Sequence, residues 1–386
     1  MKLGRLFLLF GCIPFLYGEE TRPYNTKKHG YCGGEYIYLW MKNSPAPAPL
    51  VVSGPNVAAY APVLGQPNTS VILGNKPIDN EARSGAKFFA GAWLDAAHIY
   101  GLEANYLFLC ERSNTKSVES NGLTGSPCLT FPFFNPVTGS ESSALLAEEN
   151  LYSAQAILKV TNSMQNSELN ALFKILKNSK RSNLDILLGF LWWNFKEHLT
   201  FKASSPNVTP PYDVYTTNDQ FKTSNNFYSG QFGIIGDYLW NRFFVQLKAS
   251  AALGAMQGSL KVQGKFITNN FDGYTALQLF PAGYTAMPTN AGSSTRTWFS
   301  VLSQANVNLG YNVAKNVDCF IGYLFLYVTN VLFASNQIDR VINPSQAPAI
   351  SANPSTEVVG EKRPKMLFNK SQFWVQGLNT GINIRF

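Results

Sequence analysis

The feature that most constrains the fold of this chain is a two-residue alternation of apolar with polar or small side chains. In residues 243–254 the odd-numbered positions are all apolar, and the even-numbered ones include Gln246 and Lys248. Residues 100–108 and 299–310 repeat the pattern. Successive side chains of a strand point to opposite faces of its sheet, so each segment predicts a strand with one apolar face.

The composition indicates that the apolar faces meet lipid. Charged residues make up 14% of the chain, well below the roughly 25% usual in soluble domains. The longest uncharged apolar stretch, residues 319–334, is shorter than the roughly 20 residues that a membrane-spanning helix needs. Strands in lipid must pair every backbone amide with a neighbour, which requires a closed barrel. The sequence therefore predicts an all-β fold, a transmembrane antiparallel up-and-down β-barrel.

About ten strands fit the pattern, and twelve is the alternative. The connections near Ala96, Trp240 and Ala314 are short, whereas the alternate ones are long and rich in Pro, Asn, Ser, Thr and Gly, as expected for periplasmic turns and extracellular loops. The predicted strands are residues 32–43, 85–96, 98–111, 148–161, 183–199, 224–239, 241–258, 297–312, 315–330 and 371–386. The long loops are residues 44–84, 112–147, 259–296 and 331–370.

One periplasmic connection is too long for a turn. In residues 162–182 the apolar side chains of Leu169, Leu172, Phe173 and Leu176 have helical spacing. We expect a short periplasmic amphipathic helix, packed against the barrel rim, folded inward as a partial plug, or docked on a partner.

Both ends of the chain carry export features. Lys2 and Arg5 precede the apolar residues 6–17, which predicts a signal peptide over residues 1–18 and a single barrel domain over residues 19–386. The last strand alternates up to an aromatic terminus. Gly381, Ile384 and Phe386 have the arrangement of the signal read by barrel-assembly machinery. These features predict an outer-membrane location.

Several segments resemble the beta-barrel porin-seven family of bacterial outer-membrane proteins. The most specific are Gly322-Tyr323-Leu324-Phe325-Leu326-Tyr327 and, further on, Asn343-Pro344-Ser345-Gln346. Others are residues 35–40, 63–69, 83–88, 133–139, 337–340 and 373–386. The resemblance covers nearly the whole mature chain. It implies a barrel in the outer membrane, and it implies little about a substrate.

Catalytic and metal-binding constellations are not evident in the sequence. His29, His98 and His198 are predicted to lie on both sides of the membrane, and no phosphate-binding, zinc or calcium motif is present. We therefore expect no enzyme, catalytic residue, metal or cofactor. Cys110 and Cys128 flank one loop and are the candidate disulfide.

Alternation places polar side chains in the lumen. Glu103, Lys248 and Arg385 are the charged candidates, with Gln304 and Asn306 beside them. Such charges bias ion passage in an open pore, or pair with one another across a filled lumen. Paired aromatics such as Trp192-Trp193 are expected at the membrane interface.

Two functions remain. The first is a porin-like passive channel for small hydrophilic solutes or ions. The second is a non-conducting structural or adhesive barrel whose loops meet envelope or host-surface partners. Twelve or more strands favour a pore, whereas eight to ten favour a plugged scaffold. Membrane lipid and the barrel-assembly machinery are partners in either case. Nucleic acid is excluded, because the net charge of +8 is scattered and forms no basic run.

Overall fold

The computed structural model describes residues 29–55, 61–176, 181–210, 212–270, 276–351 and 359–386. The predicted signal peptide, residues 1–18, lies outside them. No helix among the described residues is long and apolar enough to cross a membrane.

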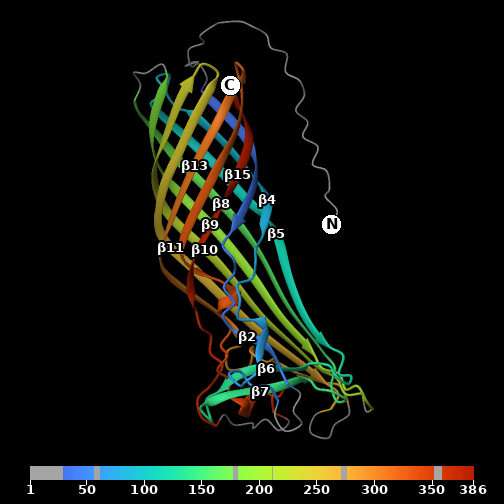
Figure 1. The fold of residues 1–386 in the computed structure, drawn as a ribbon. Helices are drawn as coiled ribbons and strands as arrows, with labels where there is room; N and C mark the ends of the chain where they lie inside the picture. The colour runs from blue at the N-terminus through green and yellow to red at the C-terminus, as the bar shows by residue number, and fades with distance from the viewer. Residues whose placement is uncertain (1–28, 56–60, 177–180, 211, 271–275, 352–358) are drawn as a thin grey trace.

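Ten antiparallel strands form a closed barrel, as the alternation predicts (Figure 1). Around the ring the order is β10-β9-β8-β5-β4-β1-β15-β14-β13-β11, and β11 pairs with β10 to complete the circle. The barrel strands are β1 (Gly30–Met41), β4 (Ala82–Trp93), β5 (Tyr100–Ser120), β8 (Ala154–Leu176), β9 (Ser182–Ser204), β10 (Tyr215–Trp240), β11 (Phe243–Thr268), β13 (Gly292–Ala314), β14 (Val317–Leu332) and β15 (Lys370–Arg385).

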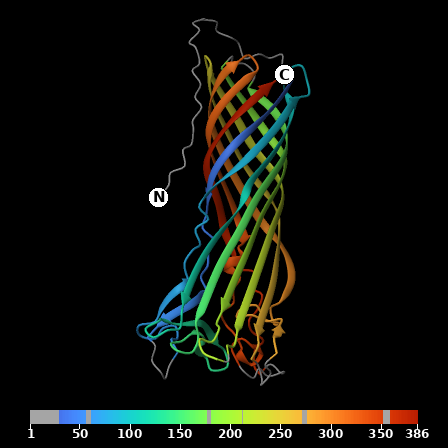
Figure 2. The same cartoon turned by 90° about the vertical axis from the view of Figure 1, so that its right-hand side faces the viewer.

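The two ends of the barrel differ. One end, here called the turn end, carries the connections at residues 94–99, 241–242 and 315–316. The first and last strands also meet there, where the Gly30 amide donates to the Phe386 carbonyl at 2.9 Å and the Phe386 amide donates back at 2.8 Å. At the opposite loop end, β5 and β8–β11 continue well beyond β1 and β4 (Figure 2).

The segments predicted as outer loops contain regular structure. Within residues 44–84 and 112–147, four strands form a separate sheet of order β3-β2-β6-β7: β2 (Pro49–Gly54), β3 (Ser70–Gly74), β6 (Cys128–Asn135) and β7 (Ser140–Ala147). A short β12 (Gln278–Phe280) pairs with β11. Side chains such as Phe131 and Leu146 from this small sheet pack with Phe201 and Phe221 from the inward face of the long strands. The long strands persist beyond the membrane because this shared core buries their inward side.

The predicted amphipathic helix over residues 162–182 is wrong in its described part. Residues 162–176 belong to β8, which pairs with β5 on one side and β9 on the other. Asn166, Glu168 and Asn170 point inward at every second position, while Leu169 is 58% exposed on the outside. Two long neighbouring strands supply hydrogen bonds along the whole segment, and this outweighs the helical spacing of four apolar residues.

An apolar belt surrounds the turn-end half of the barrel. Its outward side chains include Phe232 and Ile234 on β10, Leu253 on β11, and Leu378 and Ile382 on β15, each more than 40% exposed. From Tyr228 to Trp240, β10 rises about 30 Å, taking ~3.3 Å per residue and a tilt of about 40°. This height matches the hydrocarbon core of a bilayer.

Candidate functional site

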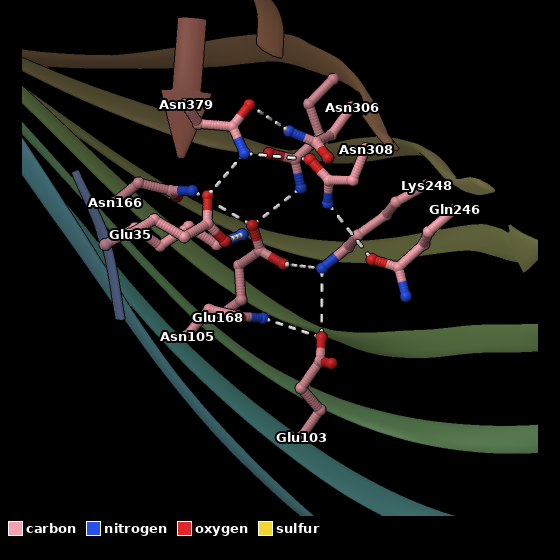
Figure 3. A network of polar contacts seen from close by, with 12 residues as sticks. Glu35, Glu103, Asn105, Asn166, Glu168, Gln246, Lys248, Asn306, Asn308 and Asn379 are labelled. Atoms are coloured by element: carbon pink, nitrogen blue, oxygen red, sulfur yellow. Dashed lines mark hydrogen bonds and ion pairs between the residues drawn. The ribbon is translucent and has the colours of Figure 1, made fainter. Parts of the chain in front are cut away.

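The lumen contains a layer of polar side chains near the turn end, here called the polar network (Figure 3). Lys248 on β11 lies at its centre and binds two carboxylates, Glu168 Oε2 at 3.0 Å and Glu103 Oε1 at 3.2 Å. In the ring of ten strands, β11 and β5 are four strands apart, so the second ion pair crosses nearly the full width of the lumen. The side chains of Lys248, Glu103 and Glu168 are 14%, 12% and 4% exposed.

Amides complete the coordination of these charges. Glu168 accepts hydrogen bonds from Gln304 at 2.8 Å and Asn166 at 3.1 Å, and Glu103 accepts one from Asn105 at 2.9 Å. Buried carboxylates that accept several hydrogen bonds retain their charge more readily than isolated ones. The charged side chains of the network are therefore bound to one another across the lumen by ion pairs and hydrogen bonds, and they do not line an open pore as free side chains.

A second arm of the network lies on β1, β4 and β15. Lys87 pairs with Glu35 at 2.8 Å, and Asn379 donates to the second oxygen of Glu35 at 3.0 Å. Asn306 in turn donates to Asn379 at 3.3 Å. With both arms ionised the network holds three carboxylates and two ammonium groups, so the layer carries a small negative excess.

The five predicted lumen residues occupy two places. Glu103, Lys248, Gln304 and Asn306 lie in the polar network. Arg385 is separate, paired with Asp318 at 2.6 Å beside the ends of β14 and β15. Glu168, the residue with the most contacts, was missed because the helical interpretation covered it. Its signal was the alternation Asn166, Glu168, Asn170, which indicates one polar face of a strand.

Next to the polar network, toward the loop end, an apolar layer fills the lumen, here called the apolar plug. Nine of the ten barrel strands contribute to it, and none of its buried members is more than 6% exposed. The side chain of Trp193 points into this layer and not outward to the lipid interface as expected. It packs on Phe373 at 5.3 Å between ring centroids, and Phe373 packs on Phe195 at 4.9 Å. The described structure is therefore closed at this level.

One side chain of the apolar plug comes from a connection and not from the barrel wall. Phe333 follows β14 and packs against Phe195 at 5.4 Å, with its ring fully buried. The 3₁₀ turn η1 (Ala334–Asn336) comes next, and its Ser335 donates from both amide (3.0 Å) and hydroxyl (3.1 Å) to Glu197 on β9. Asn225 on β10 accepts from the Leu332 amide at 2.8 Å. Two inward side chains of the wall thus hold the segment in place.

The connection between β12 and β13 also folds inward, and a carboxylate of the barrel wall anchors it in a similar way. Asp219 on β10 accepts from the backbone amides of Tyr284 at 3.1 Å and Thr285 at 2.8 Å. The Tyr284 ring then stacks on Phe131 of the small sheet, with 4.6 Å between centroids. Inward carboxylates beyond the apolar plug are therefore anchors for connections that fold into the barrel.

The candidate disulfide does not form in the structure. Cys110 is exposed on β5, Cys128 is buried at the start of β6, and all four described cysteines are free. The Ser120 hydroxyl binds the Pro127 carbonyl at 2.8 Å, so Cys128 lies near the far end of β5. Ten residues of strand then separate it from Cys110, about 33 Å, whereas a disulfide requires Cα atoms within about 7 Å.

The predicted assembly residues lie at the turn end, with Ile384 and Phe386 on the outer wall. Ile384 and Phe386 are 46% and 67% exposed. Gly381 faces the lumen between Phe320 and Glu35, where a Cβ atom would lie 2.7 Å from the Phe320 ring. Among the described residues, no three His, Cys, Asp or Glu side chains are grouped so that they could hold a metal ion.

The closed ring, the outward apolar belt and the polar interior define an outer-membrane β-barrel. The family model for beta barrel porin-7 (BBP7) matches residues 31–386, and the chain belongs to this family. No curated protein matches the chain.

Solved structures similar to the chain include an outer membrane protease, a hydrocarbon channel and a toluene transporter. The outer membrane protease OmpT from Escherichia coli matches at 10% identity with a TM-score of 0.44, over 94% of this chain and 98% of OmpT. A TodX mutant described as a monoaromatic hydrocarbon channel matches at 8% identity with a TM-score of 0.21, over 94% and 91%. The Ralstonia pickettii toluene transporter TbuX matches at 9% identity with a TM-score of 0.16, over 93% and 90%.

The match to OmpT, an outer membrane protease, corrects the prediction that the chain is not an enzyme. At such low identity the match assigns no activity to this chain.

Proposed function

We propose that this protein is a porin-like passage for small hydrophilic solutes or ions, and that the described structure is its closed state. The observation that carries the proposal is the polar network. Six different barrel strands each contribute a polar side chain to it: Glu35, Lys87, Glu103, Glu168, Lys248 and Gln304. A filled scaffold needs only apolar packing, whereas a charged lumen layer suits the entry of ions.

The apolar plug is the barrier in this proposal. Phe195 and Phe373 both pack on Phe333, which belongs to a connection and not to the wall. Withdrawal of Phe333 together with the segment that follows it removes one packing partner from each ring and frees both rings to turn toward the wall. The anchors Glu197 and Asn225 then set the probability of opening, because they hold that segment inside.

The orientation follows from the connections. Short periplasmic turns and longer external connections are the rule for outer-membrane barrels, so the turn end faces the periplasm. The polar network then lies on the periplasmic side of the apolar plug. Its excess of carboxylates predicts that an open passage prefers cations.

The test is single-channel recording in planar bilayers across a KCl gradient. We expect rare openings of the wild type, and more frequent ones for Glu197→Ala with Asn225→Ala. Gln263→Ala, an exposed outward position on β11, is the control and should match the wild type. The reversal potential should indicate cations, and Glu168→Gln should move it toward zero. If the anchor variant is folded and silent, the barrel is a non-conducting structural or adhesive protein.

A further inference from the structure

The outward face of β8–β11 changes character at one row of residues. Trp192, Tyr228 and Phe299 lie in the same row, because Trp192 is opposite Tyr228, and Phe299 is opposite Ala255, the partner of Tyr228. On the turn-end side of this row lies the apolar belt. Trp and Tyr gather at membrane interfaces, so Trp192 marks where β9 leaves the hydrocarbon and Tyr228 marks where β10 leaves it.

Beyond that row, every charged outward residue of β8–β11 other than His198 is a lysine. The side chains are exposed, and none takes part in the ion pairs of the described residues. No Asp or Glu occupies a described outward position of these strands there, and the bordering carboxylates are Glu111 and Glu119 on β5. These six residues, here called the lysine surface, are Lys159, Lys196, Lys202, Lys222, Lys261 and Lys265.

The strand register brings like charges together. Lys222 is directly opposite Lys261 across β10 and β11, and His198 is opposite Lys222 on the other side. Directly opposed like charges destabilise a sheet. An anion shared between two neighbouring lysines removes this repulsion. The lysine side chains cannot turn inward to find partners, because the inner face of the same strands is buried in the core shared with the small sheet.

The height of the lysine surface fits lipid headgroups. Lys196 is four residues beyond Trp192, and Lys222 is six residues beyond Tyr228. At ~3.3 Å per residue and a tilt of about 40°, their Cα atoms stand about 10 and 15 Å above the interface row. These heights are comparable with the Debye length of about 8 Å at physiological salt, and flexible lysine side chains reach back toward the membrane.

We propose that the lysine surface binds phosphate-bearing lipid headgroups of the leaflet at the loop end. Its positive charge complements phosphate. Because it lies directly above the aromatic residues of the membrane interface, we infer that its ligand is a lipid headgroup and not a soluble polyanion. Bound headgroups would brace the long strands, whose outward face has no other partner in the described structure.

The test uses the full refolded chain in neutral detergent micelles, with phosphatidylglycerol or phosphatidylcholine added and bound lipids counted by native mass spectrometry. The variant Lys196→Ala, Lys222→Ala, Lys261→Ala removes the row nearest the membrane. The control Lys76→Ala, Lys315→Ala, Lys362→Ala removes the same charge from exposed positions elsewhere. A third variant replaces the first three lysines by Arg.

We expect phosphatidylglycerol to bind more tightly than phosphatidylcholine. One basic residue contributes about fivefold at low salt, so the triple Ala variant should lose roughly 100-fold. The control and the Arg variant should retain binding, and added salt should weaken it. Equal affinity in the triple Ala variant and the wild type would overturn the proposal. So would tight binding of soluble heparin together with no preference for phosphatidylglycerol.

Discussion

Replacement of Lys248 by Met tests whether the polar network is a buried structural unit. Met keeps most of the volume of the side chain but leaves Glu103 and Glu168 facing each other without their shared cation. Removing one partner of a buried ion pair costs about 3–5 kcal/mol, because the other charge stays buried and uncompensated. Lys248, Glu103 and Glu168 are all mostly buried, so both of their ion pairs count as buried. We therefore expect Lys248→Met to lower the free energy of unfolding by about 4 kcal/mol.

The assay is urea unfolding in detergent micelles, followed by tryptophan fluorescence and by the mobility shift of folded barrels in gels. Lys196→Met, on the exposed outer wall, is the matched control and should change stability by less than about 0.5 kcal/mol. The double variant Lys248→Met with Glu168→Gln should recover part of the loss, since one uncompensated charge is gone. A loss below about 1 kcal/mol for Lys248→Met, as for exposed pairs, would refute the reasoning and indicate a hydrated lumen.

Two further predictions concern packing and reactivity. Gly381→Ala should lower the free energy of unfolding by about 1–3 kcal/mol, since its Cβ would lie 2.7 Å from both the Phe320 ring and the Gly34 carbonyl. Gly230→Ala, with no neighbour within 4 Å, is the control, and equal effects in the same urea assay would contradict the steric argument. Burial raises the pKa of the Cys128 thiol to about 11, so at pH 8 very little of it is the reactive thiolate. Iodoacetamide should therefore label the exposed Cys110 and spare Cys128 in the folded protein. Peptide mass spectrometry that finds equal labelling would show that β6 is not packed as described.

The sequence by itself determined the strands and their faces. Side chains alternate along any strand, so the inward assignment of Glu103, Lys248 and Gln304 needed no knowledge of their neighbours. The short connections near Trp240 and Ala314 were evident because apolar alternation stops and resumes within a few residues. These signals are local, and they were enough to predict a barrel of about ten strands.

Only the tertiary structure decided which residues meet inside. Whether Lys248 contacts Glu168 depends on the register of every strand between β11 and β8, and closure of the ring sets that register. The length of β8 also depends on distant parts of the chain. The apolar residues of 162–176 have helical spacing, and the segment is extended only because β5 and β9 are long enough to pair with it. The placement of Phe333 in the lumen depends on anchors more than a hundred residues away, Glu197 and Asn225. Alternation shows which side of the wall a residue faces, but the residue it touches there is set by the closed ring.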